Sequence, residues 1–283
     1  MGQSKGDTMQ FSASRAFTDA FQLLGARFGM LVGIWLLFFA AIIGLLAVFG
    51  GMFFALIRQT SGGGSPLAGM GGSLSLFYLL YLLMLFAQQI ALSRASTGRA
   101  GDTFSVALGS GLRGALPMLG VLLIYVVVGT GAGLVVSLIL AGIVAGTQSP
   151  AIAVVLTLLI LIAAFYLFAR LSLVLPLVAI EEVRNPLTAI AKAWKLTAHK
   201  SIKIALTWGL VLIAVFVLYG IGLMVTIGLP APGNVPGPTG SIAFLILMLV
   251  MGLSAGLYMV TLTTALYEQL APSSAELTAA TFE

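Results

Sequence analysis

The chain contains 283 residues, of which 60% are hydrophobic and 7% are charged, and its formal net charge is +5. Water-soluble globular proteins have about 25% charged residues, so this composition excludes that class. The absence of cysteine excludes disulfides, thiolate metal sites and a cysteine nucleophile. Because the apolar runs follow one another without a soluble insertion, we predict one integral membrane domain over residues 1–283.

Six apolar runs are long enough to cross a hydrocarbon core of ~30 Å as helices, which requires about 20 residues each. In chain order they cover approximately residues 29–57, 74–93, 116–146, 151–180, 202–229 and 241–267. The sequence therefore predicts an all-α polytopic membrane protein with six transmembrane helices and a short tail over 271–283.

Lysine and arginine are distributed unevenly between the two sets of loops. Most precede the first run or lie between the second and third or the fourth and fifth runs, whereas the opposite loops contain Arg58 alone. Cytoplasmic loops carry the excess of basic residues in membrane proteins. We therefore predict that both termini are cytoplasmic.

A short amphipathic stretch precedes the first, third and fifth runs, over about 12–28, 102–115 and 185–201. Each stretch begins with a residue type that favours the helix N-cap: Ser12, Asp102 and Asn185. These patterns predict three tandem units, each an interfacial amphipathic helix followed by a two-span hairpin, all with the same orientation. The alternative is that amphipathic flanks recur here, as in many polytopic proteins, without an internal repeat.

The third amphipathic stretch is the most basic. Pro186 favours the first helical position, and the polar side of the helix and the residues after it form a membrane-surface basic face of Lys192, Lys195, Lys200 and Lys203. Such a helix lies in the headgroup layer and attracts anionic lipid. Because these charges would lie flush with the membrane, we do not expect nucleic acid as a partner.

Arg170 is a charge inside an apolar run, and such residues are candidates for function. It lies 15 residues before Asn185, while Gln88 and Gln89 lie 14 and 13 residues before Asp102. The repeat would thus place Arg170, Gln88 and Gln89 at similar depth, where they could bind a lipid headgroup or an anion. The alternative interpretation is that Arg170 anchors its span at the interface and bonds a neighbouring helix.

The run after Arg170 continues apolar to Ile180, so either the helix is strongly tilted or this part packs against other protein. Pro176 favours a bend, because it cannot donate a hydrogen bond to the Ser172 carbonyl. Glu181 and Glu182 should pair with nearby basic residues or face water. Four glycine pairs have the spacing that lets membrane helices approach closely: Gly29 and Gly33, Gly129 and Gly133, Gly142 and Gly146, and Gly252 and Gly256.

The run FARLSLVLPLVAIEEVRNPLTAIAKAWKLTAHK and the segment TLTTALYEQL at the end of the sixth run resemble the bacterial glycerophosphoryl diester phosphodiesterase membrane-domain family. In some relatives this module is fused to a soluble phosphodiesterase barrel. Here the tail APSSAELTAATFE follows the sixth run. The resemblance therefore implies a stand-alone membrane module of the bacterial inner membrane, without a catalytic barrel.

We expect a non-enzymatic protein that binds or organises anionic lipid, a membrane protein partner or a second copy of itself. The alternative is a transporter or channel for a small anion or lipid-derived solute. The apolar runs lack Asp and Glu, which argues against proton-coupled transport. With one histidine and no cysteine, neither a zinc site nor a serine triad can be assembled from standard residues, so we expect no enzyme, no cofactor and no metal.

Overall fold

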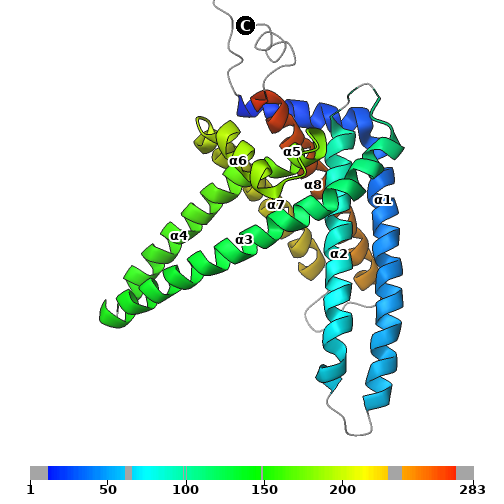
Figure 1. Ribbon diagram of the computed structural model, residues 1–283, viewed down its shortest axis with the longest axis horizontal. Helices are drawn as coiled ribbons and strands as arrows, with labels where there is room; N and C mark the ends of the chain where they lie inside the picture. The colour runs from blue at the N-terminus through cyan, green and yellow to red at the C-terminus, as the bar shows by residue number, and fades with distance from the viewer. Residues whose placement is uncertain are drawn as a thin grey trace, which may run out of the picture. The chain divides into compact units, whose positions relative to one another are not determined.

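The computed structural model describes residues 12–60, 66–97, 99, 101–147, 149–228 and 238–271. Over these residues it is helical, with α1 (Ala13–Thr60), α2 (Pro66–Ser96), α3 (Phe104–Thr147), α4 (Pro150–Leu171), α5 (Val174–Ile180), α6 (Pro186–Thr197), α7 (Ser201–Gly228) and α8 (Pro238–Leu270) (Figure 1). Six helical segments are long and apolar enough to cross a membrane. The prediction of an all-α, six-span protein is confirmed; the tail over 271–283 lies almost entirely outside the described residues.

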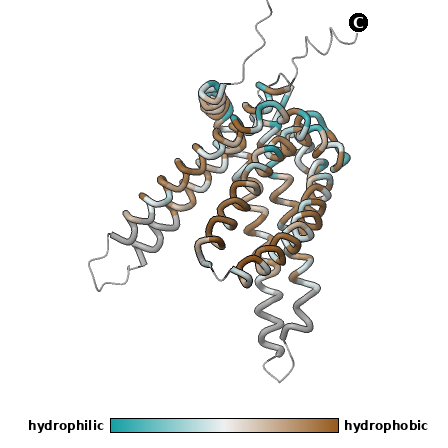
Figure 2. Tube along the Cα trace, turned by 90° about the vertical axis from the view of Figure 1, so that its left-hand side faces the viewer, coloured by the Kyte–Doolittle hydropathy of each residue, from teal (hydrophilic) through white to brown (hydrophobic). Residues whose placement is uncertain are grey.

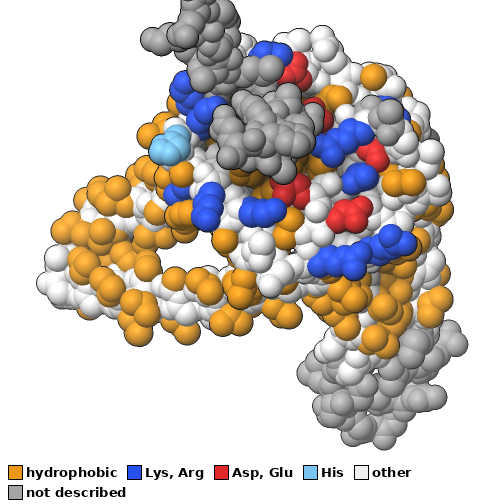
Figure 3. Space-filling view, turned by 45° about the horizontal axis from the view of Figure 1, so that its top comes forward, with side chains coloured by type: hydrophobic (Ala, Val, Ile, Leu, Met, Phe, Trp, Pro, Cys, Tyr) orange, Lys and Arg blue, Asp and Glu red, His pale blue; other side chains and the backbone are white. Residues whose placement is uncertain are grey.

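The spans are hydrophobic along their middle, and their hydrophilic residues lie near the helix ends (Figure 2). In α3, large apolar side chains such as Val127 and Leu138 are exposed by 71% and 73%. Residues 114–147 of this helix contain no charged side chain, and hydrophobic side chains follow one another along its outer part in Figure 3. Exposure of this kind is stable where acyl chains cover the surface, so these residues fit a lipid-facing span.

The chain divides into two compact units. The first contains the described residues of 1–24, 157–173 and 193–283, and the second those of 25–156 and 174–192. Each unit has its own buried core: Ile204, Leu257, Leu262 and Leu266 in the first, and Leu31, Ile90, Leu92 and Leu177 in the second. The assignment of the whole chain to one membrane domain stays a prediction.

Two of the three predicted N-caps are confirmed. The Ser12 hydroxyl accepts a hydrogen bond from the Arg15 amide at 3.5 Å, and the Asn185 side chain accepts one from the Leu187 amide at 3.0 Å. The prediction for Asp102 is wrong, because α3 begins one residue later and is capped by Thr103, whose hydroxyl accepts from the Val106 amide at 3.4 Å. The Asp102 carboxylate instead forms a buried ion pair.

The three amphipathic stretches differ in how they join the spans. The stretches predicted over 12–28 and 102–115 continue into their spans as parts of α1 and α3. The third forms a separate helix, α6, which a turn at residues 198–200 divides from α7. The arrangement in three tandem units stays a prediction.

The candidate span over 151–180 agrees with the prediction. It is broken within, as the bend expected from Pro176 requires, because α4 ends at Leu171 and α5 begins at Val174. The missing N–H of Pro176 explains the break, since the carbonyl four residues earlier loses its donor. Six of the seven residues of α5 are buried, and α5 contacts α2 and α3. The apolar run therefore extends to Ile180 because it packs against protein, which was the second of the two alternatives.

Close helix packing in the second unit uses other glycines than the predicted pairs. A Cβ added to Gly129, Gly133, Gly142 or Gly146 would meet nothing within 4 Å. By contrast, a Cβ at Gly111 would overlap the carbonyl oxygen of Ala87 in α2, and one at Gly114 would lie 2.9 Å from Ile90 Cδ1. The contact between α2 and α3 thus depends on Gly111 and Gly114.

Candidate functional site

Arg170 belongs to the first unit and is buried at the end of α4, with 8% of its surface exposed. Its Nη2 donates a hydrogen bond to the Trp194 carbonyl oxygen at 3.0 Å, and its Nε donates to the Thr197 hydroxyl at 3.4 Å. The guanidinium carbon lies 3.8 Å from the centroid of the Trp194 ring. Stacking of this kind is worth about 2 kcal/mol when the cation is desolvated. Arg170 therefore links α4 to the end of α6.

Two further side chains support this link. Thr197 is fully buried, and its hydroxyl lies within hydrogen-bonding distance of the carbonyl oxygens of Ala193 and Arg170, at 2.9 and 3.4 Å. The Tyr166 hydroxyl lies 3.0 Å from the Ser201 hydroxyl at the start of α7. The end of α4 is thereby held against the α6–α7 turn by polar contacts in an apolar environment, where such contacts are strong.

Replacing Arg170 with alanine should lower the free energy of unfolding by about 3 kcal/mol, since it removes the Trp194 stack and the hydrogen bond to the Trp194 carbonyl oxygen. A double-mutant cycle of Arg170→Ala and Trp194→Ala, measured by SDS titration in mixed micelles, should give a coupling energy of about 2 kcal/mol. Purely additive effects would show that Arg170 does not act through Trp194.

Gln88 and Gln89 belong to the second unit, near the end of α2. Gln88 is buried, with 5% of its surface exposed, and Gln89 is half-buried. Since Arg170 belongs to the other unit, a shared binding site of Arg170, Gln88 and Gln89 stays a prediction.

The membrane-surface basic face is exposed, apart from Lys200, which is half-buried. Lys192 donates to the Glu181 carboxylate at 2.9 Å, which confirms the expectation that Glu181 pairs with a nearby base. Among the described residues, no acidic group lies within ion-pairing distance of Lys195, Lys200 or Lys203. The sequence contains no Asp or Glu between Glu182 and Glu268, so no acidic residue lies near these lysines along the chain.

Arg94 and Asp102 form a buried ion pair in the second unit that sequence reasoning missed. The Arg94 Nε lies 2.9 Å from Asp102 Oδ1, and the Thr97 hydroxyl donates to Asp102 Oδ2 at 2.7 Å. Arg94 Nη1 also donates to the carbonyl oxygen of Ile180 at 3.1 Å. A cation is favourable at a helix C-terminus. Arg94 therefore ties the ends of α2 and α5 to the start of α3.

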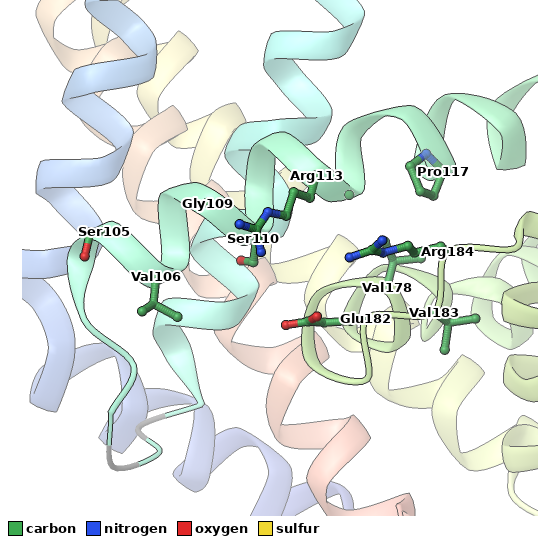
Figure 4. A pocket seen from close by; sticks show the side chains of 11 residues that line it. Ser105, Val106, Gly109, Ser110, Arg113, Pro117, Val178, Glu182, Val183 and Arg184 are labelled. Carbon is green, nitrogen blue, oxygen red and sulfur yellow. The ribbon is translucent and has the colours of Figure 1, made fainter.

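A pocket of about 290 Å³ lies in the second unit between the first turns of α3 and the segment that follows α5. Figure 4 shows Ser105, Ser110 and Arg113 on the α3 side, while the side chains of Glu182 and Arg184 extend toward α3 from the other side. The sequence contains a weak signal for it, since Arg184 directly precedes the Asn185 cap and Arg113 lies in a glycine-rich stretch. Nothing in that signal indicates that the two arginines line one pocket.

Metal binding finds no support in the part of the chain that the structure describes, where no three His, Asp or Glu side chains group together as ligands. The expectation that the protein is not an enzyme and uses no cofactor stays a prediction.

Residues 143–281 match the family model for the membrane domain of glycerophosphoryl diester phosphodiesterase. This part of the chain is similar to that family. The matched part of the membrane domain begins in the last turns of α3 and includes Arg170, the membrane-surface basic face and Arg184. It is a membrane domain and not the catalytic domain of the phosphodiesterase. Neither the curated proteins nor the solved structures gave a match.

Proposed function

We propose that this protein binds or organises anionic lipid at the cytoplasmic surface of the bacterial inner membrane. The observation that carries the proposal is the turn between α6 and α7. The turn and the helix residues on either side of it, 194–203, expose Lys195 and Lys203 together with two large apolar side chains, Trp194 at 41% and Ile202 at 70%.

This combination suits the boundary between acyl chains and headgroups. Apolar side chains enter the acyl region, and each lysine near the surface contributes about 1 kcal/mol of attraction to anionic lipid. Because none of these lysines has an acidic partner among the described residues, their charge is free to act on lipid. A membrane protein partner with an acidic surface would meet the same charges.

The triple variant Lys195→Gln, Lys200→Gln, Lys203→Gln should retain markedly less phosphatidylglycerol than wild type when the protein is gently solubilised and examined by native mass spectrometry. The loss follows from about 3 kcal/mol of removed electrostatic attraction, and it should grow smaller as salt is added. Retention of phosphatidylethanolamine should change little.

The matched control is the charge-conserving variant Lys195→Arg, Lys200→Arg, Lys203→Arg, which should retain phosphatidylglycerol as wild type does. Equal retention by wild type and the glutamine variant would overturn the role of these lysines. Saturable anion flux into proteoliposomes would instead favour the alternative function, a transporter or channel for a small anion or lipid-derived solute.

A further inference from the structure

The pocket between α3 and the segment after α5 has an excess of positive charge. Arg113 and Arg184 both line it, and neither forms an ion pair with any residue that the structure describes. The carboxylate that lines the pocket is Glu182, whose Oε1 lies 3.9 Å from Nη1 of Arg94. Glu182 is thus partly neutralised by a residue outside the pocket, and two guanidinium groups remain for a ligand.

The chemistry of the lining selects phosphate. A guanidinium presents planar paired donors that match two oxygens of a phosphate, and such charge-assisted bonds are among the strongest in proteins. Ser105 supplies a hydroxyl from the first turn of α3, where the positive end of the helix dipole also favours an anion. Val106, Pro117 and Val178 form an apolar wall suited to the carbon part of an ester.

The position of the pocket along α3 suits a lipid headgroup. Arg113 lies three residues before the apolar run that begins at 116. Its neighbours Leu112 and Leu116 are exposed by 66% and 67%, as expected of residues that meet acyl chains. The pocket volume of about 290 Å³ is at the lower end of small-molecule sites, which are about 300–1,000 Å³.

Several contacts hold the backbone segments that carry the two arginines. A Cβ at Gly120 would lie 2.7 Å from Pro186 Cγ, so the start of α6 lies directly against α3 only because residue 120 is glycine. Gly114 similarly allows Val178 to approach α3, since a Cβ added at residue 114 would lie 3.2 Å from Val178 Cγ1. Glu182 has a φ of 53°, a left-handed conformation that is unfavourable for a side chain with a Cβ. The segment carrying Arg184 is therefore held in a defined conformation.

We propose that Arg113 and Arg184 bind the phosphate of a phosphate ester in this pocket. The inference rests on the proposed function and deepens it, because it names the chemical group that a lipid would place at a discrete site. A phospholipid headgroup and a free phosphate ester share this chemistry, so the experiment has an arm for each.

The first arm measures binding of dihexanoylphosphatidylglycerol to the purified full chain by isothermal titration calorimetry, below the critical micelle concentration of the lipid. The second arm uses glycerol 3-phosphate. Arg113→Gln and Arg184→Gln should each weaken binding about tenfold, as expected for the loss of one charge-assisted hydrogen-bonding group. Arg113→Lys should bind with intermediate affinity, since lysine keeps the charge but not the paired donors.

Arg15→Gln is the matched control, because it makes the same chemical change at an exposed arginine that pairs with Asp19 on α1. Far-UV circular dichroism and gel filtration would show that each variant is folded. A tenfold loss of affinity for either probe, with the affinity of Arg15→Gln unchanged, supports the site. The probe that binds identifies the source of the phosphate. Binding in the lipid arm alone indicates a headgroup, and binding in both arms indicates that the phosphate ester suffices.

Unchanged binding by Arg113→Gln and Arg184→Gln would overturn the inference. If native mass spectrometry then still shows lysine-dependent retention of phosphatidylglycerol, the proposed function stands without this pocket. If wild type binds neither probe and retains no anionic lipid, both this inference and the proposed function fail, because both require that the protein binds anionic lipid.

Discussion

Asp102→Ala is expected to destabilise the protein by about 3–5 kcal/mol, the cost of removing one partner of a buried ion pair. The Asp102 side chain is 4% exposed and that of Arg94 is 17% exposed, so water cannot replace the lost carboxylate effectively. The Thr97 hydroxyl, which donates to Asp102 at 2.7 Å, would also lose that acceptor. Because Arg94 holds the end of α5 through the carbonyl oxygen of Ile180, the loss should extend to α5.

The measurement is the free energy of unfolding by SDS titration in mixed micelles, followed by circular dichroism. Glu181→Ala is the matched control, because it removes a carboxylate from an ion pair whose side chains are 49% and 31% exposed. Exposed ion pairs contribute about 0–1 kcal/mol, so this variant should remain close to wild type. Equal effects of the two substitutions would show that burial of the Arg94–Asp102 pair does not matter for stability.

Gly111→Ala should destabilise the protein by about 1–3 kcal/mol, although alanine is the better helix former by ~1 kcal/mol. The added methyl group would overlap the Ala87 carbonyl oxygen and lie 3.0 Å from the Ala91 methyl group. An oxygen of the α2 backbone cannot rotate away as a side chain can. The two helices would therefore have to separate, and packing around Ile90 would be lost.

Gly129→Ala, in the same helix, provides the control. A Cβ there meets nothing within 4 Å, so only the gain in helix propensity remains, and stability should rise by up to ~1 kcal/mol. Thermal unfolding of the two variants in one detergent would separate these effects. Strong destabilisation by Gly129→Ala would indicate that this glycine contacts a second chain, as its spacing to Gly133 suggested.

Local chemistry was sufficient to predict several parts of this protein. The length of the apolar runs predicts the six spans, because a helix must cover the hydrocarbon thickness whatever its neighbours are. The caps at Ser12 and Asn185 follow from side-chain hydrogen bonds to amides two or three residues away. The break after Leu171 follows from Pro176, which affects a carbonyl only four residues earlier. All of these depend on residues close in the sequence.

The candidate sites depend on contacts between side chains of different helices and loops, and only the tertiary structure shows these contacts. Asp102 is a residue type that favours the N-cap, yet its carboxylate pairs with Arg94. Thr103 caps α3 instead. Arg113 and Arg184 line one pocket because glycines in α3 allow the segment after α5 to approach. No periodicity along the chain encodes such an approach, since it is set by the steric fit between helices.

The sequence by itself determined the class of protein, its spans and the basic character of α6, because these follow from composition and local spacing. The tertiary structure decided which arginines stack on a ring or pair with a carboxylate. Arg170 stacks on Trp194 and Arg94 pairs with Asp102, whereas Arg113 and Arg184 have no acidic partner within the described residues. The physical reason is that an arginine's role depends on what lies within a few ångströms of its guanidinium, which the fold alone supplies.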